Sequence, residues 1–138
     1  MKALVLAVIL LMSLPLNATG KNPTPYIEIQ QPEDGSVVGT ETTLVVYAEG
    51  VGLHDPSVSI SGYGLDISLP IGGCKIKEAN NTDGTEYMYC KTKLDLKDFE
   101  DEKVEITVAV GTDTVGYVRD SVGVYVSGEA FGDAECEI

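Results

Sequence analysis

The stretch KVEITVAVGTDTVGYVRDSVGVYV (residues 103–126) has the clearest secondary-structure pattern of the chain. Apolar side chains occupy every second position of 104–110 and again of 122–126, and the residues between them are mostly polar or small. Such alternation is typical of a strand that buries one face. The intervening segment 111–116 begins and ends with glycine, which favours a turn. The stretch therefore predicts two strands joined by a turn.

The same alternation recurs along the rest of the chain. It occupies residues 26–30, 42–49, 57–61, 65–70, 74–77 and 87–91. Clusters of glycine, proline, aspartate and asparagine separate these runs, as turns separate strands in proteins. Eight short strands with one apolar face each must bury those faces against a second sheet. We therefore expect an all-β chain folded as a two-sheet antiparallel sandwich, with at most one helical turn, near residues 95–103.

The first 20 residues have the pattern of a secretory signal peptide. Lys2 precedes a mostly apolar run, 3–16, which is shorter than the about 20 apolar residues that a membrane-spanning helix needs. Ala18 and Gly20 then place small residues at positions −3 and −1 of a cleavage site before Lys21. We expect a signal peptide at 1–20, a sandwich domain at 21–127 and an acidic tail at 128–138. The mature protein would be secreted or held at the cell surface, without a membrane segment. An uncleaved N-terminal anchor is the alternative.

The chain is strongly acidic, with 22 Asp and Glu against 9 Lys and Arg among its 138 residues, a formal net charge of −13. An acidic surface repels phosphate backbones, so we expect no nucleic-acid partner. Hydrophobic residues make up 43% and charged residues 22% of the chain, which is the balance of a globular domain. A domain of this length can bury a core without the help of a metal.

Two motifs resemble those of the bacterial and archaeal immunoglobulin-like (Big-type) domains of secreted and cell-surface proteins. The opening motif of that family, a Pro-x-Asp-Gly turn followed by Val and Gly, is similar to residues 32–39. The closing motif, Ile-Thr-Val, an Asp-x-x-Gly turn and a Val-x-Val strand, is similar to residues 106–126. The matching residues are Pro32, Asp34, Gly35, Val38, Gly39, Ile106, Thr107, Val108, Asp113 and Gly116. The resemblance covers residues 26–126 and implies an immunoglobulin-like sandwich outside the cell, with no shared catalytic residues.

Three cysteines fit an exported protein, in which thiols tend to pair. Cys74 and Cys90 flank the segment CKIKEANNTDGTEYMYC, whose centre, 80–84, is dense in turn-forming residues. Folding this segment as a hairpin places the two sulfurs opposite each other, so we expect a Cys74–Cys90 disulfide; the usual pattern of the Big-type family does not include one. Two buried free thiols are the alternative. Cys136 is left over, and it either stays unpaired or bonds another chain.

The same hairpin register separates the segment into two faces. One face points to the core and carries Cys74, Ile76, Met88 and Cys90. The other face carries four lysines and two tyrosines, namely Lys75, Lys77, Tyr87, Tyr89, Lys91 and Lys93. We call this second face the Lys/Tyr ribbon and predict that it is a binding surface, because it is cationic on an acidic chain. The alternative is that the lysines only protect a sheet edge from unwanted strand pairing.

A protein partner, or self-association, is expected of a sandwich with open sheet edges, because an extended segment of a neighbouring chain can add to such an edge. Two segments of this chain could serve, residues 24–31 and the acidic tail 128–138. The tail carries Glu129, Asp133, Glu135 and Glu137, and it could lie along the lysines of the ribbon. Cys136 could then lock the contact as an intermolecular disulfide.

Two further candidate sites lie in predicted loops. The segment 95–102 holds five carboxylates, which could bind calcium because that ion prefers oxygen ligands. Its candidate ligands are Asp95, Asp98, Glu100, Asp101 and Glu102. Solvated surface charge is the alternative explanation of this segment. Asn80 begins an Asn-Asn-Thr sequon at the predicted hairpin tip and is a candidate glycosylation site.

The sequence contains no recognisable catalytic motif. His54 is the single histidine, so a zinc site of ordinary composition finds no support. The sequence also has no Gly-x-Ser-x-Gly motif to support a hydrolase site. We therefore expect a non-enzymatic extracellular module without a cofactor, acting through protein–protein contacts as a structural, adhesive or accessory subunit of a cell-surface assembly. The alternative is a secreted, calcium-assisted ligand-binding protein or hydrolase that uses the carboxylates of 95–102.

Overall fold

The computed structural model describes residues 24–78 and 84–128, and the regular elements in that part of the chain are strands and one short 3-10 turn. The strands are β2 (Tyr26–Gln31), β3 (Val37–Val38), β4 (Glu41–Val51), β5 (His54–Gly62), β6 (Leu65–Pro70), β7 (Cys74–Glu78), β8 (Thr85–Asp95), β9 (Glu102–Thr112) and β10 (Gly116–Val126). The turn, η2 (Lys97–Phe99), lies between β8 and β9. The predictions of an all-β chain and of one helical turn near residues 95–103 are confirmed.

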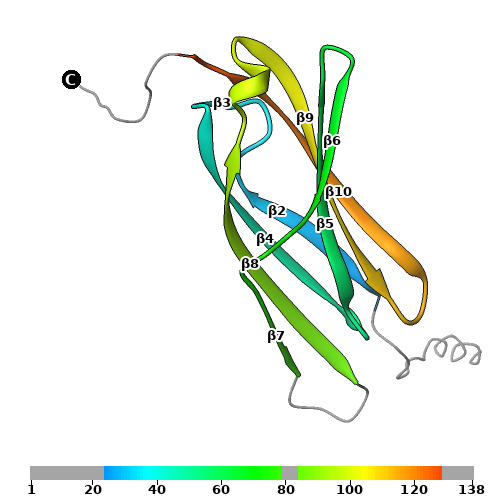
Figure 1. Ribbon diagram of the computed structural model, residues 1–138. Coiled ribbons are helices and arrows are strands. Elements are labelled where there is room, and N and C mark those ends of the chain that lie inside the picture. Colours follow the sequence, from blue (N-terminus) through cyan, green and yellow to red (C-terminus); the bar gives the residue numbers. More distant parts are fainter. Residues whose placement is uncertain (1–23, 79–83, 129–138) are drawn as a thin grey trace, which may run out of the picture.

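The strands form two sheets that pack face to face, as the predicted sandwich requires (Figure 1). One sheet has the order β3-β10-β9-β5-β6, and the other has the order β2-β4-β8-β7. The prediction of an antiparallel sandwich needs one correction, because β3 runs parallel to β10, with Val37 opposite Tyr125. β3 has two residues, so its alternation is too short to be recognised in the sequence.

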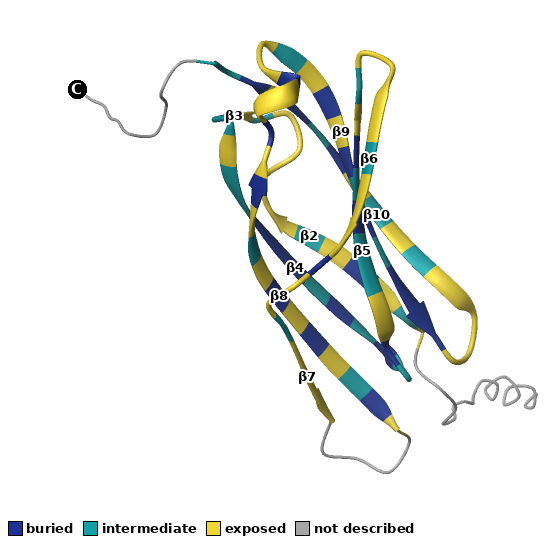
Figure 2. Ribbon diagram, in the orientation of Figure 1, coloured by how far each residue is buried: buried dark blue, intermediate teal, exposed yellow. Residues whose placement is uncertain are grey.

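The alternation in the sequence becomes the alternation of buried and exposed residues along each long strand (Figure 2). In β9, Val104, Ile106 and Val108 are buried, and they share one apolar cluster with Leu44 and Val46 of β4 in the other sheet. Removing apolar surface from water contributes about 25 cal/mol for each Å² that is buried. The core therefore lies between the two sheets and derives from the alternating pattern.

One end of the sandwich is closed by η2 and the residues before it. The backbone N–H of Leu96 donates to the carbonyl of Thr40 at 2.7 Å, and the N–H of Phe99 donates to the carbonyl of Leu96 at 2.9 Å. Leu96 and Phe99 are both completely buried. The acidic segment 95–102 therefore also carries the apolar side chains that close the core.

Several predicted features lie outside the described residues. They are the signal peptide at 1–20, Asn80, Cys136 and all of the tail 128–138 except Gly128. Within the described residues, no helix is long and apolar enough to cross a membrane.

Candidate binding surface

A disulfide joins the two strands that carry the Lys/Tyr ribbon. Cys74 in β7 lies opposite Cys90 in β8, with the two sulfurs 2.03 Å apart and the two Cα atoms 4.0 Å apart. The same register places Ile76 opposite Met88. The predicted disulfide and the predicted register of the hairpin strands are thus confirmed.

Ile76 requires a correction, because it was expected in the core together with Cys74. Its side chain lies on the inward face of β7, yet it is 45% exposed, whereas Met88 beside it is fully buried. β7 is the edge strand of its sheet. The inward face of an edge strand is buried only where the opposite sheet reaches as far, and around Ile76 it does not.

The ribbon residues lie together on the outer face of the four-stranded sheet. Lys75 is opposite Tyr89, and Lys77 is opposite Tyr87. Directly opposite residues of neighbouring antiparallel strands point to the same side of a sheet. Lys75, Lys77, Tyr87 and Tyr89 enclose a shallow hollow of about 270 Å³. Lys91 and Lys93 continue the exposed row further along β8.

The outer face extends beyond the predicted ribbon to two more tyrosines. Tyr47 of β4 lies opposite Tyr89, and its ring is stacked on that of Tyr87 with the ring centres 6.3 Å apart. Tyr26 of β2 follows, with its ring centre 6.1 Å from that of Tyr47. Sequence reasoning missed these two residues, although each lies two positions before a glutamate in its strand and so shares a face with it.

Charge is divided across this face. Glu28 and Glu49 lie on β2 and β4, the tyrosines occupy the middle, and Lys75 and Lys77 lie on the edge strand β7. The two lysines occupy the position that edge protection requires. Edge protection does not require the tyrosines of the inner strands β4 and β8, and exposed aromatic groups of this kind are characteristic of contact surfaces.

Burial and the neighbouring carboxylates raise the pKa values of two tyrosines on this face. Partial burial, followed by the hydrogen bond to Glu49, raises the pKa of Tyr47 well above its usual range. Partial burial, followed by the negative charge of Glu49, also raises the pKa of Tyr26. Both phenols therefore remain neutral hydrogen-bonding groups at any physiological pH.

The candidate calcium ligands do not converge. The carboxylate of Asp95 accepts a hydrogen bond from the backbone N–H of Lys97 at 3.0 Å, and that of Asp101 accepts one from Gly128 at 3.1 Å. Asp98, Glu100 and Glu102 are the remaining candidates. Within residues 24–78 and 84–128, no group of three or more His, Cys, Asp or Glu side chains could hold a metal ion. Two of the five carboxylates thus serve local backbone contacts.

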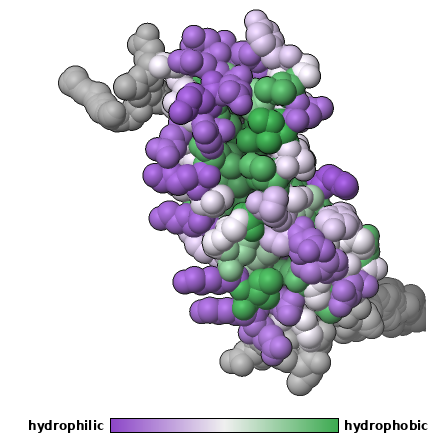
Figure 3. Space-filling view, viewed as in Figure 1, coloured by the Kyte–Doolittle hydropathy of each residue, from purple (hydrophilic) through white to green (hydrophobic). Residues whose placement is uncertain are grey.

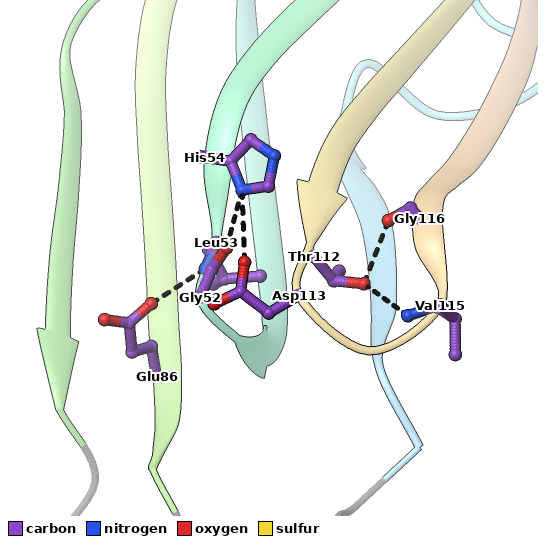
Figure 4. Close-up of polar contacts among 8 residues, drawn as sticks. All are labelled: Gly52, Leu53, His54, Glu86, Thr112, Asp113, Val115 and Gly116. Carbon is purple, nitrogen blue, oxygen red and sulfur yellow. Dashed lines mark hydrogen bonds and ion pairs between the residues drawn. The ribbon is translucent and has the colours of Figure 1, made fainter.

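At the end of the sandwich nearer β7, polar side chains make contacts that stabilise the turns (Figure 4). His54 lies with its Nδ1 2.7 Å from the carbonyl oxygen of Gly52 and 4.0 Å from a carboxylate oxygen of Asp113. The carboxylate of Glu86 accepts a hydrogen bond of 2.8 Å from the backbone N–H of Leu53. His54 therefore takes part in turn contacts that link the β4–β5 and β9–β10 connections.

The N-terminal segment 24–31, one of the two candidate donors for a neighbouring chain, has a place in its own sandwich. β2 pairs with β4 of the same chain, with Ile27 opposite Ala48. Ile27 is buried in the core. This segment is therefore a strand of its own domain, and serving a neighbour would require it to leave its pairing with β4.

Comparison with known proteins yields fold similarity alone. No family model matches the chain, and no curated protein does. Among solved structures, an endo-β-1,4-mannanase from Thermotoga petrophila is similar over 78% of this chain, with a TM-score of 0.56 and 16% identity. An engineered protein is similar over 75% of this chain, with a TM-score of 0.51 and 18% identity. The matched region spans 20% of each of those chains. At such low identity the similarity concerns the sandwich and not its activity.

Proposed function

We propose that the protein is an exported immunoglobulin-like module without catalytic activity, which binds a protein partner as a structural, adhesive or accessory subunit of a cell-surface assembly. The observation that carries the proposal is the outer face of the four-stranded sheet, where exposed tyrosines lie beside the lysines of β7. Aromatic side chains supply large contact areas in interfaces, and lysines attract an acidic partner.

The strand order supports the immunoglobulin-like part of the proposal. Immunoglobulin domains place strands A, B, E and D in one sheet and strands C, F and G in the other. The order β2-β4-β8-β7 corresponds to A-B-E-D, and the order β10-β9-β5 corresponds to G-F-C. The disulfide departs from antibody domains, because it joins neighbouring strands of one sheet instead of bridging the two sheets.

The disulfide also supports export. Disulfides form and persist in oxidising compartments and are rare in the cytosol. The Cys74–Cys90 bond agrees in this respect with the signal-peptide pattern of residues 1–20. The rival function, calcium-assisted ligand binding or hydrolysis, lacks a comparable observation, because the carboxylates of 95–102 are not gathered into a site within the described residues.

Cross-linking on intact cells of the source organism tests the proposal. A lysine-reactive reagent should link Lys75, Lys77, Lys91 or Lys93 to a partner protein in the surface fraction. The variant Tyr87→Ala/Tyr89→Ala keeps every lysine, so a loss of these links would report lost binding and not lost reactivity. Tyr117→Ala/Tyr125→Ala is the matched control, because both tyrosines are exposed on β10 in the other sheet. Cytoplasmic protein, or links that survive the ribbon variant, would contradict the proposal.

A further inference from the structure

One flank of the sandwich leaves apolar side chains uncovered between its two sheets. In β6, Leu69 lies opposite Val58 and Ile67 lies opposite Ile60 of β5. Because Val58 and Ile60 are buried in the core, their neighbours in β6 point to the same inner side of the sheet. Yet Leu65 is 41% and Leu69 is 46% exposed, and Ile67 is partly exposed.

In the other sheet, Ile76 of β7 also faces inward and is 45% exposed. We call Leu65, Ile67, Leu69 and Ile76 the open flank. Viewed from this side, apolar surface runs down the molecule between β6 and the strands β8 and β7, with hydrophilic groups beside it (Figure 3). An edge strand of each sheet therefore leaves inward-facing apolar side chains uncovered.

β7 also has unpaired backbone on this flank. Among the described residues it has a strand partner on one side only, β8. The 4.0 Å between the Cα atoms of Cys74 and Cys90 marks a pair that does not exchange backbone hydrogen bonds. The N–H and C=O groups of Cys74, Ile76 and Glu78 therefore point away from β8. They form a row that an added strand can bond.

The sequence of residues 129–138 matches this acceptor in pattern and charge. Small or apolar residues occupy one set of alternate positions, Ala130, Gly132, Ala134, Cys136 and Ile138. The other set is acidic except for Phe131, and it consists of Glu129, Asp133, Glu135 and Glu137. Alternation with period two is the pattern of a strand with one apolar and one polar face.

We propose, on the basis of the proposed function, that residues 133–138 of a second copy of this chain add as a strand to the free edge of β7. Ala134, Cys136 and Ile138 would point inward and cover Ile76 of the open flank. Glu135 and Glu137 would lie on the outer face beside Lys75 and Lys77. Main-chain bonds and apolar burial supply the affinity, and the opposite charges fix the register.

The free edge of β6 is a poorer acceptor. The outward positions of β6 include Asp66 and Ser68, and they offer no positive charge to an acidic strand. Charge complementarity therefore selects β7 between the two edges.

The donor is a second copy because of where the described chain ends. Gly128 is held near Asp101 at the end of the sandwich closed by η2, whereas β7 extends toward the other end (Figure 1). A donor segment at one end and an acceptor edge toward the other make a heterologous contact. Such a contact repeats from copy to copy and builds a filament unless a ring closes.

Sedimentation velocity of the chain from Lys21 to Ile138, in a Cys136→Ser background that prevents adventitious disulfides, tests this inference. The parent protein should form concentration-dependent oligomers. Ending the chain at Gly128, or introducing Ile76→Asp, should weaken association at least tenfold. Both changes affect exposed or terminal positions, and thermal unfolding checks that the domain remains folded. Val115→Asp is the matched control, since Val115 is 59% exposed at the β9–β10 turn, and it should associate normally.

Two complementation experiments make the test specific. Mixing the truncated chain with the Ile76→Asp chain should give a 1:1 complex and nothing longer, because one supplies the edge and the other the donor strand. The reversal Lys75→Glu/Lys77→Glu should weaken association roughly threefold to tenfold. Adding Glu135→Lys/Glu137→Lys should restore it.

Monomers at high micromolar concentration in every protein would overturn the inference, as would oligomers that survive both truncation and Ile76→Asp. Neither outcome affects the cell-surface cross-links from the ribbon to a different protein. The proposed function and this inference can therefore fail separately.

Discussion

The hydroxyl of Tyr47 donates a hydrogen bond of 2.8 Å to the carboxylate of Glu49, the next residue along the outer face of β4. The bond joins the aromatic row to the acidic side of the same sheet. A neutral phenol can donate to a carboxylate, whereas a phenolate beside it would meet a like charge. The contact therefore holds the Tyr47 ring against that of Tyr87 and disfavours ionisation of the Tyr47 hydroxyl.

The stability of the domain should fall as the pH rises above about 10, the usual pKa of tyrosine. The pKa of Tyr47 is raised in the folded state, so the folded state keeps a proton that the unfolded state loses. This contribution is fully present below pH 10 and disappears above it. Tyr47→Phe should give a shallower decline. Urea unfolding across this pH range measures the two slopes, and equal slopes would contradict the assignment.

Removing the disulfide should lower the free energy of unfolding by about 3 kcal/mol, the amount expected for a closed loop of about 15 residues. The double variant Cys74→Ala/Cys90→Ala avoids a lone thiol. Urea denaturation under non-reducing conditions gives the value, and Cys136→Ser serves as the control that should leave stability unchanged. A double variant as stable as the parent would show that the bond does not constrain the unfolded chain.

Phe99→Ala should cost about 3–5 kcal/mol, because it empties the space at the closed end of the core. The Phe99 side chain is fully buried, and the space beside Gly62 that a Cβ atom would occupy lies 3.4 Å from its ring. Tyr63→Ala is the control, since Tyr63 is 88% exposed and its loss should change stability little. Chemical denaturation compares the two, and a similar effect of both would refute the assigned role of Phe99.

Gly73→Ala should destabilise the domain by about 1–3 kcal/mol. Gly73 has a φ of +70°, and an added Cβ would lie 2.7 Å from the carbonyl oxygen of Lys91. Gly72→Ala is a neighbouring control, because a Cβ there meets nothing within 4 Å. Thermal unfolding should show a lower Tm for Gly73→Ala alone. Matching Tm values would mean that the β6–β7 crossover adjusts freely.

The hairpin was predictable because the sequence of residues 74–90 determines which of them lie opposite each other. Two cysteines at equal distances from a cluster of turn residues allow one symmetrical pairing, and the structure has that pairing. The long strands were predictable for a similar reason, since alternation over seven or more residues indicates a strand with one buried face. Val37–Val38 was not predictable, because two residues cannot show a period.

The exposure of Ile76 was not predictable either. Alternation states which side chains share a face, but it does not state how far the opposite sheet extends. Tyr26 and Tyr47 were overlooked for a related reason. They come from strands far from the cysteines in sequence. Sheet pairing alone brings the Tyr47 ring beside Tyr87 and the Tyr26 ring beside Tyr47.

The parallel pairing of β3 with β10 determines how the domain would respond to a pulling force. β3 lies near the N-terminal side of the domain and β10 lies at its C-terminal side, and both run in the same direction. Tension on the two ends would therefore slide one strand along the other, loading the bonds from Tyr125 to Ser36 and from Ser127 to Val38 together. The disulfide would meanwhile prevent the chain between Cys74 and Cys90 from extending. Single-molecule stretching should show that the β3–β10 pairing ruptures in one step. The extension that follows should be shorter by the length of chain that the disulfide encloses.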